Sequence, residues 1–210
     1  MLISFEEINQ ILLSENINII GAFHIGAHNC EELPFYHKLG INNTDILWID
    51  AIPSKVSEAI NNGIPNVYNA VITDKDDIEV VFNISNNGQS SSLLEFGTHL
   101  QEHPHIKFID TIKQKSITID SFFTRNNILA SKYNFWNFHI QGAELMALKG
   151  AVQSINFVKA IHIKVNEKEL YINCGLIGDI DRFLYKYNFK RVLTNMTIHG
   201  WGDALYIIDK

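Results

Sequence analysis

The sequence has few cysteines, no long apolar run and no excess of basic residues. Cys30 and Cys174 are the two cysteines among 210 residues, too few for a disulfide framework and without metal-ligand spacing. We expect both to be buried, reduced thiols. No apolar run approaches the roughly 20 residues that a transmembrane helix needs, and the first residues lack the basic flank of a signal peptide. These absences predict a cytoplasmic protein with no membrane partner.

The charge balance argues against another class of partner. Lys and Arg number 17 against 23 Asp and Glu, which gives a formal net charge of −6. A protein that binds nucleic-acid backbone broadly needs a basic face, so we expect no nucleic-acid partner. Apolar residues make up 46% and charged residues 19% of the chain, as in globular proteins. No repeat, linker or low-complexity segment interrupts the chain, which predicts a single domain over residues 1–210.

The most informative stretch runs from Phe135 to Ala151. Residues 135–140 form a short aromatic and β-branched run, which is typical of a buried strand. Residues 143–149 have the periodicity of a short helix, and Gly150 is a suitable place for it to end. A buried strand that turns through Gln141 and Gly142 into a helix places side chains at the carboxyl end of a sheet. Ligands bind there in open α/β folds.

The rest of the chain alternates strands and helices. An amphipathic helix is expected over 5–14, with Ser4 as a possible N-cap, so residues 1–17 would pack on the outside of the sheet. A polar start at Asp120 predicts a helix there with an acidic N-cap. This alternation predicts a doubly wound α/β sheet that is mostly parallel. The closing strand pair is too close in sequence for a crossover helix, so it should be antiparallel. The expected strands are 18–23, 45–49, 66–71, 78–84, 116–119, 135–140, 158–165, 189–194 and 204–208, with further helices over 54–61 and 176–187.

Two strand ends carry candidate binding residues. Gly26 and Ala27 follow the first strand, where small residues would let a ligand approach the backbone. Asp50 follows the second strand, where a carboxylate can accept both hydroxyls of a ribose. A turn or helix cap before Pro53 is the alternative role for Asp50.

Two other regions have an open interpretation. The turn-rich loop 85–92 could contact a substrate or be a solvated connection. His99, His103 and His105 match no metal motif, and solvated surface histidines are the simpler interpretation. In the strand over 158–165, His162 and Lys164 should project to one face.

With these segments in order, the chain resembles the FkbM-type methyltransferases, which are S-adenosylmethionine-dependent O-methyltransferases. The resemblance rests on the opening His-Ile-Gly-Ala-His-Asn, on Trp48-Ile-Asp-Ala-Ile-Pro53 and on Thr118-Ile-Asp120. It continues in the serine loop over 89–93, in Ile140-Gln-Gly-Ala-Glu-Leu-Met-Ala-Leu-Lys-Gly-Ala151, and in Trp201-Gly-Asp-Ala-Leu-Tyr206. It implies a Rossmann-like methyltransferase sheet with an antiparallel last strand.

The resemblance also implies roles for individual residues. S-adenosylmethionine would be the cofactor, and a hydroxyl of a sugar, glycan or other small polar molecule would be the methyl acceptor. Gln141 and Glu144 would face the methyl-transfer cleft with His139, and Ser91, Ser92 and Lys164 would contact the acceptor. The cofactor would be held by His24, Gly26, Ala27, His28, Asp50, Ala70 and Val71.

The chain departs from the family at three acidic positions, which are occupied here by His24, His139 and Lys164. His139 could replace a carboxylate as general base, because an imidazole suits proton removal near neutral pH. The alternative is a catalytically silent relative that binds a ligand or partner, with the basic residues forming an anion pocket or a structural core. A metal held by His24, His139 and His162 has no support from spacing, so no metal is expected. The frequent Ile and Asn are compatible with a giant virus of the mimivirus kind, whose protein would lie in the host cytoplasm or the virion.

Overall fold

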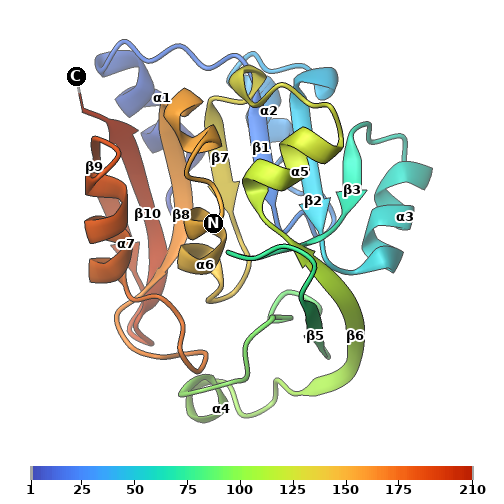
Figure 1. Cartoon of the computed structure of the whole chain (residues 1–210). Coiled ribbons are helices and arrows are strands. Elements are labelled where there is room, and N and C mark those ends of the chain that lie inside the picture. Colours follow the sequence, from blue (N-terminus) through green and yellow to red (C-terminus); the bar gives the residue numbers. More distant parts are fainter. Residues whose placement is uncertain (1, 210) are drawn as a thin grey trace.

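The computed structural model describes residues 2–209, which form two sheets and flanking helices (Figure 1). The helices are α1 Phe5–Ser14, α2 Leu33–Lys38, α3 Pro53–Asn61, α4 His99–Glu102, α5 Ile119–Arg125, α6 Glu144–Lys149 and α7 Ile177–Tyr185, with 3-10 turns η1 Asn43–Asp45, η2 Ala130–Lys132 and η3 Ser154–Phe157. The strands are β1 Ala22–Ile25, β2 Ile46–Asp50, β3 Val67–Asn69, β4 Val71–Ile72, β5 Glu79–Ser85, β6 Phe108–Ile117, β7 Phe135–Phe138, β8 Ala160–Asn166, β9 Phe189–Met196 and β10 Trp201–Ile208.

The large sheet confirms the predicted doubly wound topology. Its seven strands have the order β3-β2-β1-β7-β8-β10-β9. Five neighbouring strands run parallel: β3, β2, β1, β7 and β8. Strand β10 is antiparallel to both β8 and β9. The strand order reverses between β1 and β7, so the carboxyl ends of these two strands mark the point where an open α/β sheet binds ligands.

Alternate residues of the strands supply the two faces of this sheet. Phe23 and Trp136 face a core closed by α5, α6 and α7, while Trp48 and Phe135 face a core closed by α1, α2 and α3. Helix α1 begins as predicted: Ser4 and Glu7 form a capping box, and Ile8 and Leu12 are buried. The helices on both faces leave the carboxyl edge of the sheet available for a site.

The second sheet was not predicted. Strands β4, β6 and β5 form it, with β5 antiparallel to β6. The expected strand over 66–71 is therefore split between two sheets, and the run over 78–84 lies outside the parallel sheet. The expected short strand over 116–119 is the end of the long β6. This sheet and α4 extend beyond the carboxyl edge of the large sheet (Figure 1).

Two further boundaries differ from the predictions. The first strand lies at Ala22–Ile25 rather than 18–23, because the Ile20 N–H donates to the Asn134 side chain instead of joining a ladder. Helix α5 is capped by Thr118 rather than Asp120. The Asp120 carboxylate accepts hydrogen bonds from Ser154 and from the Gln153 N–H.

Two predictions from absences can be compared with the structure. Cys30 and Cys174 are buried free thiols, as predicted. Within residues 2–209, no helix has both the length and the apolar character to cross a membrane.

Candidate functional site

The turn after β1 is fixed against both neighbouring strands. The N–H groups of Gly26 and Ala27 donate to the Ile49 carbonyl at 2.8 and 2.9 Å. Gly26 has a φ of 92°, and a Cβ at this position would lie 2.2 Å from the His139 carbonyl oxygen. Any residue larger than glycine would therefore push β1 and β7 apart. The close packing of these strands thus requires glycine at position 26.

Asp50, at the tip of β2, connects this turn to the second strand. Its Oδ2 accepts from the His28 N–H at 2.7 Å, and its Oδ1 accepts from the Ile52 N–H at 2.8 Å. Burial raises the pKa of the Asp50 carboxyl although both N–H groups favour the ionised form. The proposed turn cap is present, and Asp50 also faces a cleft.

That first cleft lies at the carboxyl ends of β1, β2 and β7. Small and apolar side chains form most of its wall, with Asp50 as the acidic residue. The predicted cofactor and substrate residues that line it are Gly26, His28, Asp50, Ala70, Val71, Ser91 and His139. Ala27 and His24 do not line it, because both point into the buried core under α2.

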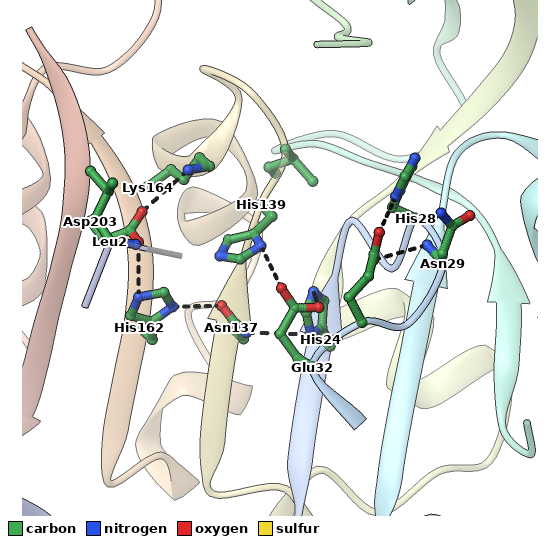
Figure 2. Close-up of polar contacts among 12 residues, drawn as sticks. Leu2, His24, His28, Asn29, Glu32, Asn137, His139, His162, Lys164 and Asp203 are labelled. Atoms are coloured by element: carbon green, nitrogen blue, oxygen red, sulfur yellow. Dashed lines mark hydrogen bonds and ion pairs between the residues drawn. The ribbon is translucent and has the colours of Figure 1, made fainter. Parts of the chain in front are cut away.

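His24 belongs to a row of buried polar side chains across neighbouring strands (Figure 2). Its Nδ1 lies 2.8 Å from the Tyr36 hydroxyl, which accepts from Asn137 at 3.0 Å. On the other side of Asn137, its Oδ1 lies 2.8 Å from His162 Nδ1. Burial, the largest cause, and the nearby His162 lower the pKa of His24 to about 3. His24 is therefore neutral at pH 7, and its side chain connects the strands from within the core.

His139 follows β7 and lies between the Lys164–Asp203 pair and Glu32 (Figure 2). Its Nδ1 is 3.6 Å from Glu32 Oε1, and its Nε2 is buried without a hydrogen-bond partner. Burial, together with the nearby Lys164 and the two neighbouring histidines, holds the pKa of His139 well below 6.5. Burial also raises the pKa of Glu32. The imidazole is neutral at pH 7, the form that a general base requires.

Glu144 corrects one expectation. Its side chain is buried, and its two oxygens accept from the Ile140 N–H at 3.1 Å and the Gly142 N–H at 2.8 Å. Burial raises the pKa of Glu144 to about 7. The carboxylate holds the loop between β7 and α6 and does not face either cleft, because the loop's own N–H groups point at it.

A second cleft adjoins the first, and Gln89 lines both. Two of the predicted site residues, Gln141 and Lys164, line the second cleft. Trp201, Tyr171 and Asn166 also line it. Ser92 is fully buried and donates to the Gln141 carbonyl at 2.8 Å, so it supports the wall without reaching the interior. The loop 85–92 therefore contributes to both clefts, and the expected substrate residue Ser91 lies in the first one.

The histidines of α4 and its following loop also reach this second cleft. His99, His103 and His105 all line it. His99 is 5% exposed and stacks on Phe96 with ring centroids 4.3 Å apart. The interpretation as solvated surface histidines is therefore wrong for His99, which the apolar cluster around Phe96 and Tyr171 covers.

Lys164 and Asp203 form an ion pair between β8 and β10 (Figure 2). The Lys164 Nζ donates to Asp203 Oδ1 at 3.2 Å, and Asp203 Oδ2 lies 3.6 Å from His162 Nε2. Burial raises the pKa of Asp203, but the adjacent His162 and Lys164 lower it by more. The pKa of this carboxyl therefore lies below its usual value. His162 and Lys164 share one strand face, as predicted. Sequence reasoning missed Asp203, Glu32 and Asn137, because strand register brings Asn137 and Asp203 to the site and the start of α2 brings Glu32 there.

Within residues 2–209, two groups of side chains could hold a metal ion. One is His24, Glu32 and His139, and the other is His139, His162 and Asp203, with ligand atoms within 4.8 Å of one another. His24 and His162 do not share a group, contrary to the alternative of a three-histidine site. The Lys164 ammonium on Asp203 would repel a bound cation, which disfavours the second group.

Comparison with known proteins identifies the family. Magnesium protoporphyrin IX methyltransferase from Synechocystis PCC 6803, solved with bound SAM, superposes with a TM-score of 0.46 at 9% identity over 98% of this chain and 78% of that one. A SAM-dependent methyltransferase from Aquifex aeolicus gives 0.43 at 13% identity, over 99% and 91% of the two chains. No curated protein matches. Residues 24–191 match the methyltransferase FkbM domain. Since this match spans most of the chain, the protein belongs to the FkbM methyltransferase family.

Proposed function

We propose that the protein transfers a methyl group from S-adenosylmethionine to a hydroxyl of a sugar, glycan or other small polar acceptor. The observation that carries this proposal is the pair of adjoining clefts at the carboxyl edge of an FkbM-family sheet. The lining of the first cleft, small and apolar residues with one carboxylate, suits a nucleoside, and the second cleft is polar with aromatic side chains.

The residues of the first cleft fit the cofactor. Gly26 keeps the turn after β1 free of side-chain atoms, and Asp50 supplies a carboxylate for ribose hydroxyls. Ala70 and Val71 would flank the adenine on the apolar wall. When bound, S-adenosylmethionine supplies an electrophilic methyl group on a positively charged sulfur.

The replacement of family acids adds less positive charge than the sequence suggests. His24 and His139 are both neutral at pH 7, because burial lowers their pKa values. Lys164 lines the second cleft and is paired with Asp203. The cofactor cleft therefore gains no fixed cation that would repel the sulfonium.

His139 is the proposed general base, with Gln141 as its neighbour on the acceptor side. An acceptor hydroxyl that extends from the second cleft into the first, which His139 lines, would lose its proton to the neutral imidazole as the oxygen attacks the methyl carbon. Glu32 faces Nδ1 and would favour a proton there, which leaves Nε2 as the accepting atom. Catalytic hydrogen bonds often close only in the substrate complex, so the present lack of a partner on Nε2 is compatible with this role.

The lining of the second cleft supports a sugar-like acceptor. Trp201 offers an aromatic face, and the hydroxyl of the buried Tyr171 donates to Gln141 Oε1 at 3.2 Å. Asn87, Gln89 and Asn166 add amide groups that can both donate and accept hydrogen bonds to hydroxyls. Such pairing of apolar faces with amides suits a molecule with many hydroxyls.

A catalytically silent, ligand-binding relative is the second candidate. It is favoured by the burial of His139 Nε2, an atom that has no hydrogen-bond partner. Restoring aspartate at His24 and His139 separates the two candidates. If only the doubly substituted protein binds S-adenosylmethionine, the silent candidate is favoured.

The giant-virus origin, and with it a place in the host cytoplasm or virion, is a further proposal that rests on composition alone.

A methyl-transfer assay tests the proposed function. The protein is incubated with S-adenosylmethionine and a panel of mono- and oligosaccharides, and mass spectrometry detects O-methyl products and S-adenosylhomocysteine. We expect Trp201→Ala to raise the KM for the acceptor roughly tenfold by removing an aromatic face. Phe157→Ala, at a half-exposed residue outside both clefts, should leave the KM unchanged. Equal effects of the two variants would contradict the acceptor assignment, and absence of product with every hydroxyl acceptor despite cofactor binding would contradict the reaction.

A further inference from the structure

The second cleft has an unusual charge composition for this protein. One lysine and three histidines line it, and none of its lining residues, all within the described chain, is an aspartate or glutamate. The whole chain nevertheless carries a formal net charge of −6. A site without acids in an acidic protein attracts ligands of negative charge.

The lysine is held in place at the wall of the cleft. The Lys164 Nζ donates to Asp203 at 3.2 Å and lies 4.6 Å from the centre of the Trp201 ring. The Asp203 side chain is fully buried behind it, whereas 19% of the Lys164 side chain is exposed. A ligand in the cleft would therefore meet the ammonium before the carboxylate.

The histidines provide further donors. His99 Nδ1 is buried without a hydrogen-bond partner, and the His99 and His103 rings lie 5.0 Å apart. The nearby acid, Glu102, is already occupied, because Lys168 and His199 each contact its carboxylate at 2.6 Å. The imidazoles are therefore free to bind another anion.

We propose that the acceptor carries an oxyanion, a phosphate or a carboxylate, which Lys164 and the imidazoles of His99 and His103 bind in the second cleft. This inference rests on the proposed function and narrows its acceptor to a charged sugar. Trp201 would contact the sugar ring, while the oxyanion lies toward α4 and Lys164. The two anionic groups share the same chemistry here, since both accept charge-assisted hydrogen bonds.

Binding of such an acceptor should strengthen at lower pH. Burial and the neighbouring histidines lower the pKa values of His99 and His103, so both are neutral at pH 8. An anion favours their protonated forms and would be bound together with protons. The other titratable and charged groups that face these imidazoles are Glu102 on α4, His105 after it, Tyr171 and Lys168 after β8, and His199 before β10.

Calorimetric titration tests the proposal with three ligands that share one ring: glucose 6-phosphate, glucuronate and glucose. Saturating S-adenosylhomocysteine is present, and its own binding is measured first. We expect the two anionic sugars to bind at least about tenfold more tightly than glucose at pH 6.5, and the difference to shrink at pH 8. The phosphate and carboxylate arms identify which oxyanion fits.

Variants assign the effect to the named side chains. Lys164→Met should remove most of the preference for anionic sugars, and Lys164→Arg should retain it, which separates charge from fold. Lys159→Met is the matched control, because Lys159 is exposed just before the same strand and outside the cleft. His103→Gln should reduce the pH dependence of binding.

Two results would overturn the proposal: equal affinity for glucose and both anionic sugars, or an unchanged preference in Lys164→Met. Failure of the proposed function looks different. In that case S-adenosylhomocysteine does not bind, whereas the anionic sugars still do in its absence.

Discussion

The His28 N–H donates to Asp50 Oδ2 over 2.7 Å, and this bond joins the turn after β1 to the tip of β2. The same carboxylate accepts from the Ile52 N–H and faces the cofactor cleft. One side chain therefore shapes the cleft and supplies its acid. An asparagine keeps the shape but can accept only one of these two bonds.

We predict that Asp50→Asn weakens S-adenosylmethionine binding at least about tenfold and lowers the free energy of unfolding by about 1–2 kcal/mol, because one buried N–H loses its partner. Calorimetry and urea denaturation measure the two effects. Asp110→Asn, at an exposed position on β6, is the control and should change neither. Unchanged cofactor affinity in Asp50→Asn would remove Asp50 from the binding site.

Gly26→Ala should destabilise the protein and abolish cofactor binding. Its Cβ would lie 2.2 Å from the His139 carbonyl oxygen, so β1 and β7 must separate. Gly63→Ala is the matched control, since Gly63 also has a positive φ, 79°, but nothing within 4 Å of an added Cβ. Gly63→Ala should cost only the backbone strain of about 1–2 kcal/mol and leave cofactor affinity unchanged. Equal costs in thermal or urea unfolding would show that the close approach of the two strands is unimportant.

Glu144 makes the stability of the protein depend on pH. Burial raises its pKa from 4.5 to about 7, so the folded protein binds the proton more tightly than the unfolded chain does. The resulting stabilisation is complete below pH 4.5 and is lost as the pH rises through 7, up to about 3 kcal/mol. The Glu144→Gln variant has no titrating carboxyl at this position and therefore lacks this pH-dependent stabilisation. The difference in the free energy of unfolding between wild type and variant, measured from pH 4.5 to 8, should therefore move in favour of the variant as the pH rises; a flat difference would contradict the buried, protonatable carboxyl.

His139→Ala should lower kcat roughly 100-fold with little effect on the Kd of S-adenosylmethionine, because the imidazole is assigned to proton removal. In the wild type, kcat should be constant from pH 8 to 6.5 and fall only at more acidic pH, since the pKa of His139 lies well below 6.5. His37→Ala, at an exposed histidine on α2, is the control. A kcat that falls with a midpoint at or above pH 6.5, or that is unchanged in His139→Ala, would show that another group takes the proton.

The sequence predicted the large sheet well because its strands are continuous apolar runs next to amphipathic helices. The glycine turn, Asp50 and the strand-to-helix turn after β7 could be placed because residues at strand ends meet at one edge of a parallel sheet. The first strand was misplaced by several residues, since residues 18–23 are as apolar as the true strand over 22–25. Apolar character alone does not show which backbone groups enter the ladder.

The remaining errors have a common physical origin in long-range contacts. The β5 and β6 pair is set by register between segments about 30 residues apart, so the second sheet could not be inferred from local pattern. Glu32, Asn137 and Asp203 reach the site from three different elements, and no short motif connects them. The family resemblance implied that Glu144 faces the cleft, but its carboxylate accepts hydrogen bonds from the N–H groups of Ile140 and Gly142 and is buried.

The central claim is that the altered site still binds the methyl donor. Calorimetric titration of the purified protein with S-adenosylmethionine and S-adenosylhomocysteine near neutral pH tests it most directly. Because His24 and His139 are neutral and Asp50 faces the cleft, dissociation constants in the micromolar range are predicted for both ligands, with marked weakening in Asp50→Asn. Absence of binding by either ligand to the folded wild-type protein would contradict the claim and favour the ligand-binding, catalytically silent alternative.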